Sequence, residues 1–154
     1  MRIKAVGTLI VILIFSIANP AQAQAKALTG AWMRIAFRDS TAQPLQPRFV
    51  PSFVIFSANG YFSQSVFPAG RPKIEKALKD MSKEELLSLL EGVDAWRGSY
   101  EVSGTTLTRT TLAGLDPSDE ASKLIQNMRF AGDTLILTWP NPANKAEARF
   151  VRVR

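Results

Sequence analysis

The chain has 154 residues, a formal net charge of +6, and neither Cys nor His. Without these two residue types, a Ser-His-Asp triad, a thiolate nucleophile and an imidazole general base are excluded, and zinc and copper lose their usual ligands. Lys and Arg are spread along the chain with no run of five or six, which favours an ordinary solubility charge over a patch for phosphates, membranes or nucleic acid.

The N-terminus has the pattern of an export signal. Arg2 and Lys4 precede a nearly unbroken apolar run at 6–18, and small-x-small cleavage sites follow that end at Ala23 and Ala25. The alternative is an uncleaved membrane anchor, but the run is shorter than the roughly 20 apolar residues that a span needs. The pattern therefore favours cleavage near Ala23 or Ala25.

Cleavage divides the chain into a signal peptide, residues 1–23, and a single domain, residues 24–154, with a net charge near +4. An exported domain without Cys depends on its core alone, which suits the periplasm, although secretion from the cell stays open. We expect no stable membrane span after cleavage, no nucleic-acid partner, no cofactor and a monomer.

Short strand patterns separated by turn residues fill most of this domain. Asn59-Gly60 between two apolar runs is a strong hairpin signal, and Ser103-Gly104 and Gly132-Asp133 are further turns. Thr and Leu alternate from Thr106 to Leu112, as in a half-buried strand. The predicted strands are 32–38, 49–57, 61–67, 98–102, 105–113, 124–130, 134–139 and 147–154.

A helical insertion is predicted at residues 72–92. Ser82 and Glu85 have the spacing of a capping box, and Gly92 is suited to follow the C-terminus of a helix. The pattern indicates one broken helix or two short ones, and we expect its Leu-rich face to dock on the barrel wall or on an open end. A short helical start is also predicted at residues 116–120, where Pro and acidic residues gather.

Eight strands joined mostly by short turns predict an all-β fold, an eight-stranded up-and-down antiparallel barrel with a short helical insertion. An eight-stranded barrel has room for side chains or for one small ligand. The alternative is a rolled, half-open sheet that packs on the Leu-rich helix.

Several segments in this order carry a family resemblance. The chain resembles the lipocalin-like domain family, bacterial relatives of the calycin β-barrels, over nearly all of the predicted domain. The segments are Leu28-Thr29-Gly30-Ala31-Trp32, residues 53–63, Gly98-Ser99-Tyr100-Glu101-Val102, residues 129–137 and Phe150-Val151-Arg152.

The resemblance implies a structural pair at the closed end of the barrel, in which Arg152 packs over Trp32. A guanidinium over an indole ring is attractive by roughly 0.5–2 kcal/mol. Arg149 and Arg154 compete for this role, and the alternative is a plain core aromatic with a surface charge. The chain departs from the family in the strand at 107–112, where members often have a His, so no property that needs imidazole is transferred.

Strand alternation suggests ligand-binding residues. An inward Arg109 or Arg129 would hold a carboxylate or phosphate head group, and apolar and aromatic side chains would hold a tail. The alternative places both arginines on the outer wall, as is usual for charged strand residues. The predicted ligand-binding residues are Phe53, Ile55, Tyr61, Ser63, Arg109, Arg129 and Trp139.

Three functions remain open. The first is an exported barrel that binds a small hydrophobic or amphipathic ligand, and the second is a filled barrel with an envelope or interaction role. The third is a cofactor-free isomerase-type enzyme that uses Tyr61, Tyr100 or Glu101. We expect no enzyme, because a glycosidase needs two facing carboxylates and Glu101 has no evident partner. The acids at 116–120 lack the spacing and the Gly of a Ca²⁺ loop.

Overall fold

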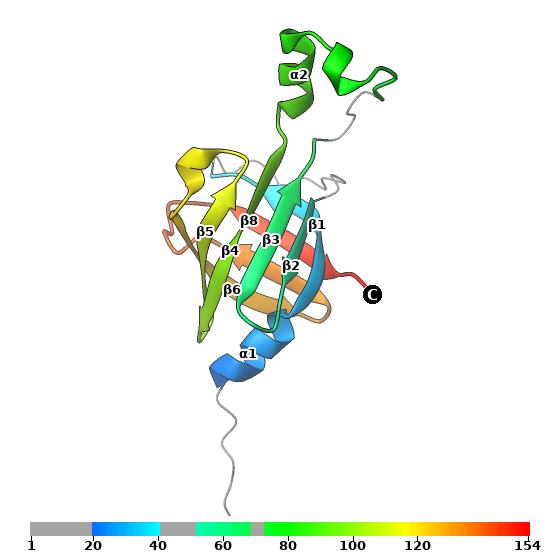
Figure 1. Ribbon diagram of the computed structural model, residues 1–154. Coiled ribbons are helices and arrows are strands. Elements are labelled where there is room, and N and C mark those ends of the chain that lie inside the picture. The colour runs from blue at the N-terminus through cyan, green and yellow to red at the C-terminus, as the bar shows by residue number, and fades with distance from the viewer. Residues whose placement is uncertain (1–19, 41–51, 69–72) are drawn as a thin grey trace, which may run out of the picture.

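The computed structural model describes residues 20–40, 52–68 and 73–154. Eight antiparallel strands follow one another around a closed barrel, and β1 also pairs with β8 (Figure 1). The predicted fold is confirmed, and the half-open sheet is wrong. The strands are β1 (Gly30–Arg38), β2 (Ser52–Phe56), β3 (Tyr61–Val66), β4 (Asp94–Ser103), β5 (Thr106–Gly114), β6 (Lys123–Ala131), β7 (Thr134–Thr138) and β8 (Glu147–Arg152).

One end of the barrel is covered by the helix α1 (Pro20–Leu28), which lies below the strands in Figure 1. The Leu28 side chain is fully buried in the main core cluster with Trp32 and Phe56. The Trp32 indole Nε1 donates a 2.7 Å hydrogen bond to the Leu28 carbonyl oxygen. Because a buried indole N–H needs an acceptor, this bond ties the helix to the first strand.

Arg152 closes the seam between the first and last strands at this end. Its guanidinium lies 4.3 Å from the centre of the Trp32 ring, and Trp32 and Arg152 are paired across β1 and β8. Arg152 Nη1 donates to the Thr29 carbonyl oxygen at 2.7 Å, and Nη2 donates to that of Ala27. A Cβ added at Gly30, where φ is +130°, would lie 2.6 Å from Arg152 Nη1, so glycine is required there.

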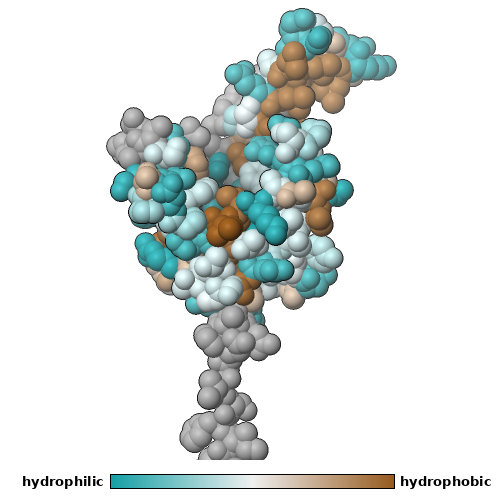
Figure 2. Space-filling model, turned by 90° about the vertical axis from the view of Figure 1, so that its left-hand side faces the viewer, coloured by the Kyte–Doolittle hydropathy of each residue, from teal (hydrophilic) through white to brown (hydrophobic). Residues whose placement is uncertain are grey.

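The helical insertion consists of the 3₁₀ turn η1 (Leu78–Asp80) and the helix α2 (Lys83–Leu90), which begins at the predicted capping box of Ser82 and Glu85. Both elements stand beyond the ends of β3 and β4, away from the barrel (Figure 1). Apolar side chains gather on this projection (Figure 2), and the exposed ones include Leu78, Leu86, Leu87 and Leu90.

The prediction that this apolar face docks on the barrel is therefore wrong. An ion pair ties α2 to the segment that precedes it, with Lys76 Nζ 2.6 Å from a Glu85 carboxylate oxygen. Within α2, Leu89 is buried. The eight-residue helix lies between β3 and β4 in the chain and beyond the ends of both strands (Figure 1).

Most of the predicted signal peptide, residues 1–19, lies outside the described residues. The expected cleavage sites at Ala23 and Ala25 fall within α1. The expected strand start at residues 49–51 also lies outside the described part. In the described ranges, no helix combines the length and hydropathy that a membrane span requires.

Candidate ligand-binding cavity

At the opposite end, the described residues leave the interior of the barrel accessible. A cavity of about 780 Å³ lies inside the strands there, and residues near the open ends of β4 and β5 border it, among them Gly92, Val93 and Leu115. A small-molecule site in a protein typically occupies roughly 300–1,000 Å³. The barrel interior is therefore large enough for one small ligand.

The strand register explains which side chains face this cavity. Trp32 is paired with Val54, Val54 with Gln64, and Gln64 with Trp96. Paired residues in a sheet share a face, and side chains alternate between faces along each strand. Because Trp32 is buried inside the barrel, Gln64 and Trp96 on β3 and β4 also face inward.

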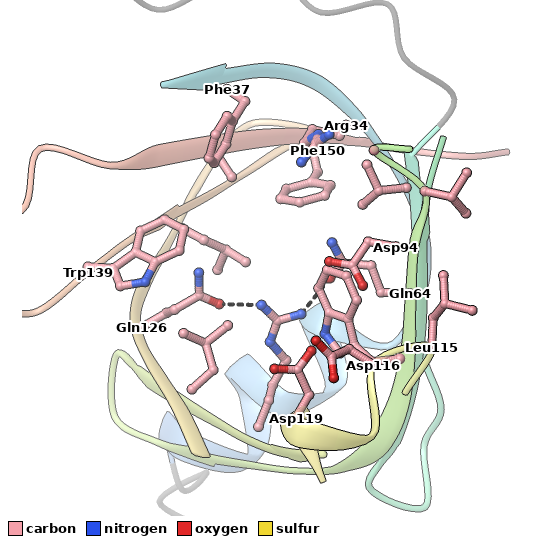
Figure 3. A pocket seen from close by; sticks show the side chains of 18 of the residues that line it. Arg34, Phe37, Gln64, Asp94, Leu115, Asp116, Asp119, Gln126, Trp139 and Phe150 are labelled. Carbon is pink, nitrogen blue, oxygen red and sulfur yellow. Dashed lines mark hydrogen bonds between the residues drawn. The ribbon is translucent and has the colours of Figure 1, made fainter. Parts of the chain in front are cut away.

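Arg109, in the middle of β5, lies deep in the barrel and is only 4% exposed. Its Nη1 donates to Gln64 Oε1 at 2.6 Å and its Nη2 to Gln126 Oε1 at 2.8 Å, the two bonds drawn in Figure 3. Its guanidinium also lies 5.3 Å from the centre of the Phe62 ring. These partners are neutral, so they orient the cation without neutralising its charge.

Burial lowers the pKa of Arg109 to about 10, because the charged guanidinium is removed from water. This value is still well above 7, so the group is a cation at neutral pH. Its Nε has no hydrogen-bond partner among the described residues. A buried cation held only by neutral groups is suited to bind an anion, which would supply the missing counter-charge.

Aromatic and aliphatic side chains form the walls above Arg109. In Figure 3, Phe37, Trp139 and Phe150 surround the open space of the cavity. Trp96, Leu124 and Leu137 complete the apolar lining. Such walls bind apolar groups by burying surface, at about 25 cal/mol per Å².

Polar groups border the cavity on two further sides. Arg34 on β1 lies beside Phe37, with its guanidinium 5.2 Å from that ring. Asp94, Asp116 and Asp119 lie on the wall formed by the start of β4 and the 3₁₀ turn η2 (Pro117–Asp119). In the described parts of the chain, no group of three potential metal ligands is present.

The structure places two of the predicted ligand-binding residues in this cavity, Arg109 and Trp139. The other five do not line it, contrary to the prediction. They face outward, since Ile55 is 52% and Tyr61 is 54% exposed, and Phe53, Ser63 and Arg129 are exposed as well. Alternation separates the two faces of a strand, but it does not say which face is inside. The residues predicted on β2 and β3 belong to the outer face.

The sequence reasoning missed the two glutamines and the three aspartates. Gln64 and Gln126 hold Arg109, and the face of β3 that holds Phe62, Gln64 and Val66 was recognisable as the alternative to Tyr61 and Ser63. The signal that could have selected it is the burial of Trp32, carried across the register of β2 and β3. Asp116 was explained as a helix start, and it does cap η2.

Comparisons with known proteins give the fold. No protein-family model and no curated protein matches the chain. A lipocalin-like protein from Bacteroides uniformis superimposes with a TM-score of 0.51 over 82% of this chain and 98% of its own, at 13% identity. This chain has the lipocalin-like barrel fold. An uncharacterised protein from Bacteroides eggerthii is similar, with a TM-score of 0.50, 11% identity, and coverage of 82% of this chain and 99% of its own.

Proposed function

We propose that this lipocalin-like barrel is a binding protein for a small amphipathic molecule with an anionic head group. The observation that carries the proposal is Arg109, a cation buried at the inner end of a cavity of about 780 Å³ with only neutral hydrogen-bond partners. A carboxylate or phosphate would neutralise Arg109, and the walls of Phe37, Trp139 and Phe150 would cover the apolar part.

The other two functions have less support. A filled barrel would have no cavity larger than a few water molecules, and this barrel has a far larger one. The groups named for an isomerase are not in the cavity lining. Glu101 and Tyr61 are exposed on the outer wall, and the hydroxyl of buried Tyr100 donates to the Ser57 carbonyl oxygen at 2.7 Å.

Tryptophan fluorescence tests the proposal, because Trp96 and Trp139 line the cavity while Trp32 lies in the core cluster. We expect alkyl carboxylates to change the emission in a saturable way, and the matching alkyl alcohols to bind about tenfold more weakly or worse, since they have no charge for Arg109. No response to carboxylates of any chain length would contradict the proposal.

A charge-matched pair of variants locates the site. Arg109→Met removes the inward cation, and Arg129→Met removes an exposed cation from β6. We expect the first variant to lose carboxylate binding and the second to keep it. Equal carboxylate affinities in the two variants would show that the head group does not bind Arg109.

We further propose that the protein is exported to the periplasm or secreted after removal of the first 23 residues. Support comes from the apolar run and the small-residue site, together with the fact that a cut after Ala23 keeps Ala25, whose carbonyl oxygen accepts from Thr29 N at 3.2 Å and Oγ1 at 3.1 Å. N-terminal sequencing of the protein from its natural host should begin at Gln24. A start at Met1 would contradict export by this signal.

A further inference from the structure

Three carboxylates lie on one wall of the same cavity, toward its mouth. Asp94 is the first residue of β4, Asp116 caps the turn η2 that follows β5, and Asp119 is the last residue of that turn. All three border the space in which Arg109 lies, and Figure 3 shows them on one side of it. The cavity is therefore not simply basic and apolar.

The three carboxylates have different local roles. Asp116 Oδ1 accepts a 2.8 Å hydrogen bond from the Ser118 backbone N–H, so this carboxylate caps the turn. Asp94 and Asp119, in contrast, form no ion pair with Lys or Arg in the parts of the chain that the structure describes. They are the carboxylates that are left to meet a cation from outside the chain.

Electrostatics within this wall point the same way. Burial raises the pKa of Asp94, a hydrogen bond with the backbone of Ala95 partly opposes this, and the negative charges of Asp119 and Asp116 raise the pKa further. A bound cation would relieve both the mutual repulsion and the loss of hydration. The indole of Trp96, which also borders the cavity beside Asp94 and Asp119, offers a face on which a cation is stabilised.

Arg109 borders the same space: with Asp94, Trp96 and Asp119 it lines a recess of about 240 Å³. Arg109 donates through Nη1 to Gln64, whose strand partner is Trp96, two residues from Asp94. It is almost fully buried, and its Nε has no partner among the described residues. A buried positive group and two carboxylates without an ion pair among the described residues thus share one recess, beside the indole of Trp96.

We propose that the cavity selects small zwitterions, molecules with an anionic group at one end and an amine at the other. The anionic group binds Arg109, and the ammonium lies between Asp94 and Asp119 against Trp96. Any further apolar part of the ligand extends into the wider cavity toward Phe150 and Trp139. This inference rests on the proposed function and specifies the class of ligand that the same site takes.

Matched pairs of ligands test the inference. Each ω-amino carboxylic acid from two to twelve carbons is compared with the unsubstituted carboxylic acid of the same length, by titration calorimetry on the full chain. In a site that recognises only an acid and a tail, the terminal ammonium weakens binding, because it must be desolvated. We expect the opposite at the best length, a preference of about tenfold for the amino acid.

The variant Asp94→Asn/Asp119→Asn removes the two free carboxylates, and Glu101→Gln is the control, since it changes the charge on the outer face of the same strand as Asp94. We expect the double variant to lose the preference for the amine while it still binds the unsubstituted acid, and the control to keep it. Thermal unfolding of each variant shows whether it is folded.

The outcomes separate the two proposals. If unsubstituted acids bind and no amino acid of any length is preferred, the zwitterion inference is overturned and the proposed function stands. If the preference exists but survives in the double variant, the amine lies elsewhere and the inference is wrong. If no acid of either kind binds, the proposed function fails and the inference fails with it.

Discussion

The two ends of the barrel use an arginine in opposite ways. At the closed end, Arg152 is stacked on Trp32 and donates to backbone carbonyl oxygens of Ala27 and Thr29. At the open end, Arg109 is more deeply buried, yet its hydrogen-bond partners are two glutamine side chains beside a cavity. The first arginine is held by the chain itself and stabilises the fold. The second forms no ion pair among the described residues, and for this reason we propose it as the group that binds an anion.

The largest expected effect concerns the closed end. Trp32→Ala removes a 1%-exposed aromatic side chain, its hydrogen bond to Leu28 and its contact with Arg152. We expect the free energy of unfolding to fall by about 3–5 kcal/mol, as for other buried Trp and Phe truncations. Urea denaturation measures this loss, and a loss below about 1 kcal/mol would mean that this end does not hold the barrel together.

A smaller loss is expected for Arg152→Met, which keeps an apolar side chain over the indole and removes the guanidinium. The cation–π contact and two hydrogen bonds to carbonyl oxygens are lost, at a cost of about 1–3 kcal/mol. Arg154→Met is the matched control, because this arginine is paired only with an exposed aspartate, Asp133. If the two variants are equally stable in denaturant, Arg152 does not stabilise the closed end more than an exposed arginine would.

A pH series tests the open end. The pKa of Arg109 is lowered to about 10, so the guanidinium is charged below that pH and loses its proton above it. Carboxylate affinity should be level between pH 6 and 9 and should fall above about pH 10, while alkyl alcohols show no such fall. Asp94 also faces the cavity, but its raised pKa affects only the acidic side of the profile. An affinity that stays level to pH 11 in folded protein would contradict the assignment of Arg109.

The smallest effect is expected at the helical projection. Leu87→Ser replaces a side chain that is 58% exposed on α2, away from the cavity. We expect a change in the free energy of unfolding within about 0.5 kcal/mol and unchanged ligand affinity. A large loss of affinity would show that α2 contacts the ligand or closes over the mouth. The binding site would then include α2 as well as the open end of the barrel.

Much of the fold could be predicted because its signals are local. Turn residues, alternation and a capping box placed eight strands and the insertion within a few residues of their observed bounds. The position of α2 could not be predicted, since an amphipathic pattern gives an apolar face without the direction of the strands that carry it. The candidate site was predicted only in part. Arg109 and Trp139, two of the predicted ligand-binding residues, line the cavity, although the direction of Arg109 had been left open. The outward Tyr61 and the inward Gln64 alternate along β3, and only the register shows which of the two faces inward.

The most direct test of the account compares Arg109→Met with Arg152→Met in two assays, carboxylate binding and unfolding by denaturant. We expect Arg109→Met to abolish binding without loss of stability, because removing a buried, unneutralised cation offsets the two hydrogen bonds that Gln64 and Gln126 lose. Arg152→Met should lose stability and, where it is still folded, bind as the natural sequence does. If Arg109→Met binds carboxylates with unchanged affinity, the open end is not the binding site that this account describes.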